Sequence, residues 1–150
     1  MPMLQVYIHA VWSTLLRQPL MTKEKRAAIF HFIEQYAASK EIHILALNGV
    51  EDHIHCLFQL NPNLPLAKHL QLLKGGSAFW INHESNLFSA HFSWAQEYFA
   101  GSVSADRLPK VKQYIATQEE HHKKQSFQEE YQFILQHYLQ QQTQDSGKPG

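Results

Sequence analysis

Two strand-like segments lie almost back to back near the middle of the chain, at residues 43–50 (HILALNGV) and 53–60 (HIHCLFQL). Both are rich in large apolar and β-branched residues, which favour an extended backbone. Asn48-Gly49, near the end of the first segment, is a turn signal. Parallel strands need a crossover of a dozen or more residues, so segments this close pair as an antiparallel hairpin. The sequence therefore predicts an antiparallel sheet.

Two further strands and four helices flank this hairpin. Alternating segments predict a strand at residues 5–12 and another, with an irregular middle, at 92–104. Apolar residues at helical spacing predict the helices, which we expect at about 22–40, from 66 up to or through Gly75-Gly76, at 106–124 and from 126 onward. The order β-α-β-β-α-β-α-α is typical of an α+β sandwich, in which helices cover one or both faces of an antiparallel sheet.

Capping signals mark where these helices begin. Thr22 is a candidate N-cap for the first, and Asp106 for the third, with Pro109 in its first turn. Ser126 and Glu129 form a capping box for the last helix, whose apolar residues are Phe127, Tyr131, Ile134, Leu135, Tyr138 and Leu139.

Length, composition and charge set the class of protein. The 150 residues predict one domain at 5–142 with a flexible polar tail at 143–150, and 44% apolar residues are enough for an ordered core. A single cysteine excludes an intrachain disulfide and fits a cytoplasmic setting. No apolar run approaches the roughly 20 residues that span a membrane. A formal net charge of zero argues against coating duplex DNA but allows a local basic groove.

His53 and His55 open the second strand of the hairpin. Residues i and i+2 of a strand point to the same face, roughly 7 Å apart at the backbone, which suits two imidazoles that converge on one ion. Ile54 and Cys56 would point the other way, into the core. Asp52 could orient a ligating ring through its second nitrogen. The pair by itself leaves two interpretations open: a metal site, or a strand end whose histidines face water.

Eleven histidines are many for a chain of this length, so other histidine chemistry needs to be considered. In histidine-triad nucleotide hydrolases, three histidines alternate with apolar residues along a strand. The third position here is Leu57, and no nucleophilic histidine is left. That class is excluded.

The segment VKQYIATQ, residues 111–118, holds the second group of polar residues. On a helix, Tyr114 and Gln118 are four residues apart and share a face. A tyrosine hydroxyl can be a nucleophile, and an amide oxygen can ligate a hard cation. Tyrosines on amphipathic helices usually serve packing, so this segment alone also leaves both roles open.

Taken together, the His-hydrophobe-His pair and a Tyr-x-x-x-Gln segment about sixty residues later resemble the single-tyrosine HUH transposases. These are small IS200-like insertion-sequence enzymes that move DNA as a single strand, and REP-associated transposases are their relatives. Most of residues 5–135 is similar to the family, segment by segment and in the same order: YIHAVWSTLLRQPL, NGVEDHIHCLF, LLKGGSAFWIN, FSWAQEYFAGSVS and YIATQEEHHKKQSFQEEY.

The resemblance implies a ferredoxin-like HUH fold and a metal-dependent DNA transposase. Such an enzyme cleaves and rejoins single-stranded DNA with hairpin ends through a 5′-phosphotyrosine, using Mg²⁺ or Mn²⁺, although other divalent ions can occupy the site. The residues implied are the nucleophile Tyr114, the metal ligands His53, His55 and Gln118, and the DNA-binding residues Arg17, Lys74, Lys110 and Lys112.

The resemblance also implies a homodimer, which we favour, and leaves open whether Tyr114 serves its own chain's histidines or those of the other subunit. His9 is assigned to packing or substrate contact. His121 and His122 are assigned to a solvated helix end, with the alternative that His122, four residues after Gln118, approaches the metal or the DNA.

Two departures from the family pattern keep an alternative function open. Leu15-Leu16 and Phe79 stand where basic residues are common in the family, which suggests a domesticated relative that binds hairpin single-stranded DNA without cutting it. A replication initiator or relaxase is disfavoured because the segment at 114–118 holds a single tyrosine.

Overall fold

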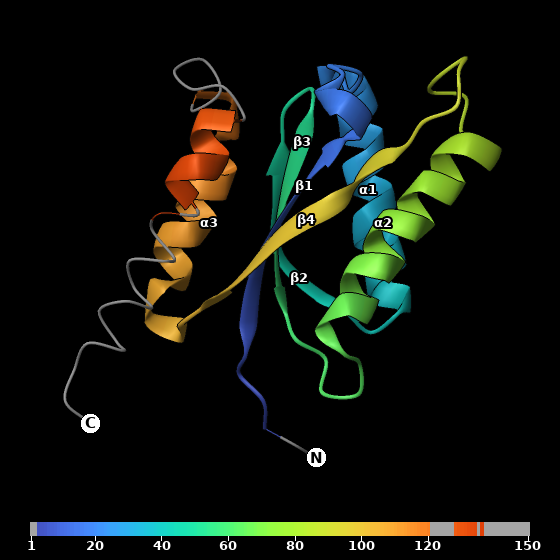
Figure 1. Cartoon of the computed structure of the whole chain (residues 1–150). Helices are drawn as coiled ribbons and strands as arrows, with labels where there is room; N and C mark the ends of the chain where they lie inside the picture. Colours follow the sequence, from blue (N-terminus) through green and yellow to red (C-terminus); the bar gives the residue numbers. More distant parts are fainter. Residues whose placement is uncertain (1–2, 121–127, 135, 137–150) are drawn as a thin grey trace. The chain divides into compact units, whose positions relative to one another are not determined.

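The computed structural model describes residues 3–120, 128–134 and 136. The chain separates into two compact units, Met1–Gln118 and Glu119–Gly150, which are described separately. The first unit holds the sheet and the helices that pack on it (Figure 1). In the second, residues 119–120, 128–134 and 136 are helical. No helix within the described residues has the length and apolar character needed to cross a membrane.

Four strands form one antiparallel sheet in the order β2-β3-β1-β4. This order along a β-α-β-β-α-β chain is the ferredoxin-like arrangement, and it confirms the predicted α+β class. The central strands are β3 and β1, and the strands have the bounds β1 Tyr7–Thr14, β2 His43–Gly49, β3 His53–Gln59 and β4 Trp94–Val103.

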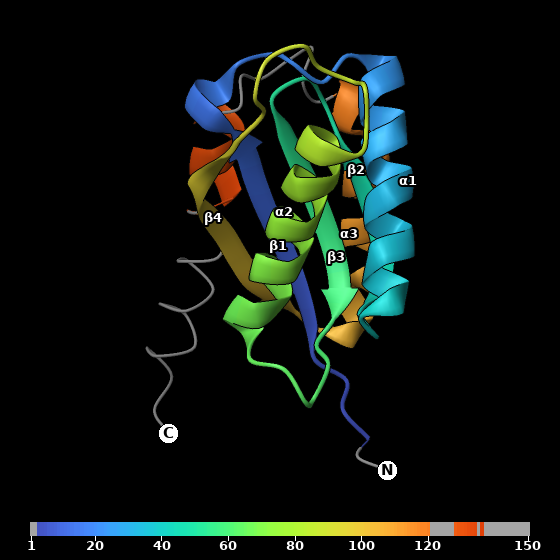
Figure 2. The same ribbon diagram turned by 90° about the vertical axis from the view of Figure 1, so that its right-hand side faces the viewer.

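Helices cover both faces of this sheet. Helices α1 (Lys23–Ser39) and α2 (Leu66–His83) lie together on one face, and α3 (Leu108–Ala116) lies on the other, as Figures 1 and 2 show from two directions. Thr22 is at the predicted N-cap position of α1. α2 runs unbroken through Gly75 and Gly76.

The alternation of β3 divides its residues between two apolar clusters. Ile54, Cys56 and Phe58 belong to the large core under α1 and α2, as predicted for the first two. Leu57 faces the other way and packs in a smaller cluster with Val103 and with Ile115 of α3. The period of two along a strand therefore leaves the histidines on the α3 side.

The predicted turn at Asn48-Gly49 is wrong, because both residues belong to β2 and pair with β3. The chain reverses at residues 50–52 instead. A Cβ on Gly49 would collide with the backbone carbonyl oxygen of His53. The glycine is therefore required by the close approach of the two strands rather than by a turn.

The third helix differs from its prediction at both ends. Asp106 lies inside a short 3-10 helix (Ala105–Arg107), and Arg107 occupies the N-cap position of α3, with Pro109 in the first turn as expected. The predicted helix is interrupted at Thr117, whose φ of −104° and ψ of 28° end α3 at Ala116; residues 118–120 are helical again, and the predicted part from 121 to 124 lies outside the described residues. The Thr117 hydroxyl donates back to the carbonyl of Gln113, a local bond that competes with helix continuation.

The irregularity predicted for the middle of the fourth strand lies instead near its start, where the register between β1 and β4 shifts between Trp12 and Thr14. Several predictions lie outside the described residues: His121, His122, Ser126, Phe127, Leu135, Tyr138, Leu139 and the tail at 143–150. That residues 5–142 form a single domain stays a prediction.

Candidate active site

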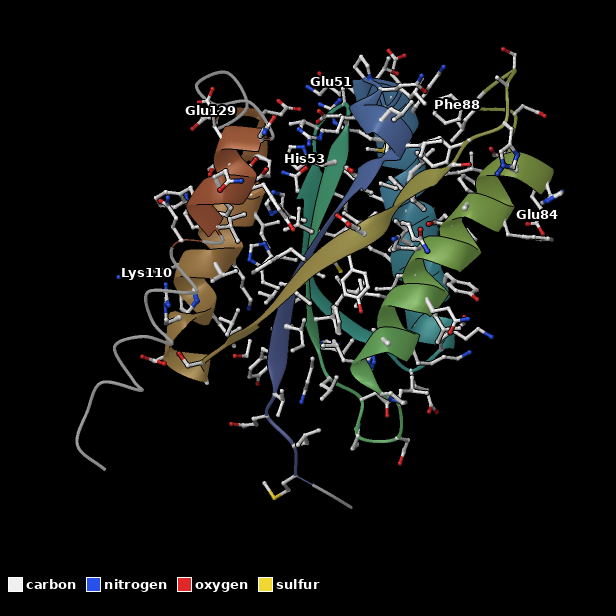
Figure 3. All side chains as sticks on the ribbon, viewed as in Figure 1. Glu51, His53, Glu84, Phe88, Lys110 and Glu129 are labelled. Carbon is white, nitrogen blue, oxygen red and sulfur yellow. The ribbon has the colours of Figure 1, made fainter. Side chains whose placement is uncertain are left out.

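His53 projects from the central strand β3 toward the α3 side of the sheet (Figure 3). His55, two residues along the strand, shares that face. Their ring centroids are 5.2 Å apart, and neither side chain is exposed to solvent. The interpretation of a strand end whose histidines face water is therefore wrong. Because burying an imidazole is costly without polar partners, the contacts of these two rings matter.

Asp52 holds the first ring. Its carboxylate oxygen Oδ1 lies 2.8 Å from Nδ1 of His53, and because a carboxylate only accepts, the ring N–H donates. Asp52 is itself held in place, because its backbone carbonyl accepts a hydrogen bond from the backbone N–H of Thr14 at 2.9 Å. The contact predicted between Asp52 and the His53 ring is therefore present, and it leaves Nε2 as the ring nitrogen that Asp52 does not engage.

His9, on the neighbouring strand β1, holds the second ring. Its Nε2 lies 2.9 Å from Nδ1 of His55, and the two ring centroids are 5.1 Å apart. His9 is itself buried. The sequence predicted packing or a substrate contact for His9, whereas the structure gives it a direct bond to His55. Only the β1–β3 register, which pairs Val11 with His55 and Leu57 with His9, reveals this contact.

Tyr114 lies beside the rings of His55 and His9. Its ring centroid is 5.6 Å from that of His55 and 6.3 Å from that of His9, both in edge-on arrangements. Its neighbour Ile115 is buried against Leu57 and anchors α3 to the sheet. Within this chain, the tyrosine therefore lies beside the chain's own histidines.

Gln118 is helical, as predicted, but it is separated from α3 by the break at Thr117. Its side chain is fully buried, and its amide nitrogen donates to the backbone carbonyl of Tyr114 at 3.2 Å. The amide oxygen Oε1 has no hydrogen-bond partner among the described residues. A buried acceptor left in this state costs about 1–3 kcal/mol, which a cation could offset.

Asn48 ties α3 to the sheet at this point. This role differs from the turn position that the sequence predicts for Asn48. Its amide nitrogen donates to the carbonyls of Ile115 and Ala116, at 2.9 Å and 3.3 Å. The last carbonyls of a helix lack intrahelical partners, so these bonds satisfy groups that would otherwise need water. Asn48 stands opposite His55 in the β2–β3 register.

The four basic residues predicted to bind DNA do not gather in one place. Lys110 and Lys112 are exposed on α3, and Lys110 points away from the sheet in Figure 3. Arg17 ends the short 3-10 helix that follows β1. Lys74 belongs to α2, on the opposite face of the sheet.

Lys74 is engaged by β4. Its Nζ donates to the backbone carbonyls of Ala95 at 2.8 Å and Gln96 at 3.0 Å, and it lies 5.6 Å from the ring centre of Tyr98. Partial burial lowers the pKa of its ammonium group below the ordinary lysine value. Lys74 therefore stabilises the packing of α2 on β4 in this structure.

The chain is similar in sequence to known proteins. Residues 3–118 match the family model described as transposase IS200 like. This chain belongs to the IS200-like transposase family. The transposase for insertion sequence element IS200 of Salmonella typhimurium is 24% identical over 119 residues, which cover 77% of this chain and 78% of the relative. The ISDra2 transposase TnpA of Deinococcus radiodurans is 21% identical, over 76% of this chain and 84% of its own length.

Solved structures show the same fold for this IS200-like transposase. A putative transposase from Deinococcus radiodurans superposes with a TM-score of 0.59 at 20% identity, covering 78% of this chain and 93% of that one. A REP-associated tyrosine transposase bound to a REP hairpin gives a TM-score of 0.58 at 13% identity, with 79% and 68% coverage. These similarities confirm the fold and the resemblance read from the sequence.

Proposed function

We propose that this IS200-like transposase cleaves and rejoins single-stranded DNA through a 5′-phosphotyrosine on Tyr114, with a divalent metal held by His53, His55 and Gln118. The observation that carries the proposal is the buried Oε1 of Gln118, which has no hydrogen-bond partner among the described residues and belongs to the segment that follows Tyr114. A nucleophile and three potential ligands thereby come from two elements, β3 and the end of α3.

The donor set fits a divalent cation that accepts both imidazole nitrogen and amide oxygen. Two imidazoles whose Nδ1 atoms are engaged by Asp52 and His9 have Nε2 as the ligating nitrogen. An amide oxygen suits Mg²⁺ or Mn²⁺. The chain's single cysteine, Cys56, faces the opposite core, so thiolate ligation is not involved. When bound, the cation would act as a Lewis acid on the scissile phosphate.

The chain's own residues account for the covalent step. The phenolic oxygen of Tyr114 would attack phosphorus, forming the O–P bond while the bond to the 3′-oxygen breaks. The phenol loses its proton, and the departing 3′-oxygen gains one. Because a phosphodiester replaces a phosphodiester, a later 3′-hydroxyl can reverse the step and join a different strand without an added energy source.

The DNA partner and the assembly are part of the same proposal. That the REP-associated relative is bound to a REP hairpin supports a hairpin-bearing single strand as the substrate. Lys110 and Lys112, exposed on the tyrosine helix, are suited to phosphate contacts, with Arg17 and Lys74 contributing from other elements. β2 and β4 are the edge strands of the sheet, so either could pair with a second copy in a homodimer.

A covalent adduct between protein and DNA tests the proposal. Wild type, Tyr114→Phe and Tyr7→Phe would be incubated with Mn²⁺ and labelled single-stranded hairpin oligonucleotides, then separated on a denaturing gel. Tyr7 is a matched control because it belongs to the same apolar cluster as Tyr114. We expect adducts with wild type and Tyr7→Phe, and none with Tyr114→Phe or with EDTA.

Two results would contradict the proposal. An adduct that survives in Tyr114→Phe would assign the nucleophile elsewhere. Hairpin binding by wild type without any adduct, whichever divalent metal is supplied, would instead favour the non-cutting relative.

A further inference from the structure

His9 is a buried histidine that the proposed chemistry does not use directly. It lies in the middle of β1, only 3% exposed, between Leu57 of β3 and Gly101 of β4 in the sheet register. A buried imidazole is tolerated when its nitrogens find partners. The partner of its Nε2 is Nδ1 of His55, at 2.9 Å.

The contact between these two nitrogens holds one proton, and its position decides what His55 can do. If His9 donates, Nδ1 of neutral His55 accepts and its Nε2 carries the hydrogen, so Nε2 cannot ligate. If His55 donates from Nδ1, its Nε2 carries the lone pair. Only the second assignment is compatible with a metal on Nε2 of His55.

His53 has the corresponding tautomer, which its own partner fixes. Asp52 can only accept, so His53 donates from Nδ1 and has its lone pair on Nε2. The His53 and His55 rings lie 5.2 Å apart on one face of β3. Both rings then have a lone pair on Nε2. The tautomer of His53 is fixed by the Asp52 carboxylate, and that of His55 by the His9 imidazole.

We propose that His9 is a positioning residue that accepts the Nδ1–H of His55 and thereby fixes the tautomer and ring orientation with which His55 meets the metal. The inference rests on the proposed function, because it assigns His9 a role toward the same metal site. It also explains why a polar ring is buried on β1 at this position. The ring of His9 also borders that of Tyr114, with the two centroids 6.3 Å apart.

Two substitutions separate hydrogen bonding from packing. His9→Phe keeps a ring of similar size but has no acceptor, whereas His9→Gln keeps an acceptor oxygen at about the distance of Nε2. The Mn²⁺ affinity of the full chain, measured by calorimetry without DNA, should fall about 10- to 100-fold in His9→Phe. It should stay close to wild type in His9→Gln.

His69 provides the control for losing a buried imidazole. It is fully buried on the other face of the sheet, where Nδ1 bonds the carbonyl of Pro65 and Nε2 accepts from the backbone N–H of Asn61, both at 2.9 Å. His69→Phe should lower the free energy of unfolding while leaving Mn²⁺ affinity unchanged.

A second readout does not depend on metal. The ¹⁵N shifts of the His55 ring in the metal-free chain should show hydrogen on Nδ1 in wild type and His9→Gln, and a shift of the proton toward Nε2 in His9→Phe. Equal Mn²⁺ affinity in wild type and His9→Phe, or a wild-type His55 with its proton on Nε2, would overturn the role of His9 alone. No Mn²⁺ binding by wild type would overturn the proposed metal site together with it.

Discussion

The adjacent glycines of α2 should respond to alanine in opposite ways. A Cβ on Gly75 would meet nothing within 4 Å, whereas a Cβ on Gly76 would lie 2.6 Å from Cζ and 2.9 Å from Cδ2 of the Tyr36 ring. Both residues are interior positions of the same unbroken helix. The two substitutions therefore share their effect on the backbone and differ in packing.

The expected changes in the free energy of unfolding follow from these backbone and packing effects. Replacing glycine by alanine inside a helix is worth about 0.5–1 kcal/mol, and Gly75→Ala should gain that amount. Gly76→Ala gains the same but must displace Tyr36, which stacks on Phe32 with ring centroids 5.4 Å apart. Overpacking of this kind costs about 1–3 kcal/mol. Gly76→Ala should therefore be roughly 1–3 kcal/mol less stable than Gly75→Ala.

Thermal and urea unfolding, followed by circular dichroism, would measure the difference. At about 2–4 °C per kcal/mol for a chain of this size, Gly75→Ala should raise Tm slightly and Gly76→Ala should lie several degrees below it. In a Tyr36→Ala background the penalty should disappear, so that both alanines stabilise alike. Equal Tm shifts in the wild-type background, or a penalty that persists without Tyr36, would refute the packing explanation.

Three further predictions concern the site face and the core. Gly49→Ala should cost more stability than Gly76→Ala in urea unfolding, because its Cβ meets the backbone carbonyl of His53, which cannot rotate away. Asn48→Ala should lower the unfolding free energy by about 1 kcal/mol per lost bond and speed amide hydrogen exchange at the end of α3, since two carbonyls lose their donor. Cys56 should react with thiol reagents only as fast as the chain unfolds, because burial raises the pKa of its thiol and disfavours the reactive thiolate; rapid labelling at neutral pH would contradict this.

Local sequence patterns predicted the strands well because successive side chains of a strand alternate between the two faces of the sheet, which gives a simple period of two in the sequence. The alternation of β3 correctly separated Ile54 and Cys56 from the histidine pair. The same local reasoning misplaced the hairpin turn. Asn48-Gly49 has the composition of a turn, but here Gly49 permits a close approach of two strands and Asn48 donates a hydrogen bond to the end of α3. Neither contact produces a periodic pattern in the sequence from which it could be predicted.

The parts of the site that periodicity missed depend on contacts between elements. The role proposed for His9 depends on the β1–β3 register, which pairs His55 with Val11 and makes His9 its diagonal neighbour. A shift of one residue in this register would have turned His9 to the other face. Lys74 was expected with the other basic residues, but the face that α2 covers is decided by the packing of the whole sheet. The pairing of His53 and His55 with Tyr114 and Gln118 came from family resemblance, not from spacing alone.

The polarity and position of the protein–DNA link test the central proposal most directly. A single-stranded hairpin oligonucleotide labelled at one end or the other would be trapped with Mn²⁺, digested with protease and analysed by mass spectrometry. The account predicts a nucleotide on the peptide that carries Tyr114, a 3′-end label retained in the adduct, and a 5′-labelled fragment released with a free 3′-hydroxyl. Retention of the 5′-end label, or attachment at a residue other than Tyr114, would contradict it.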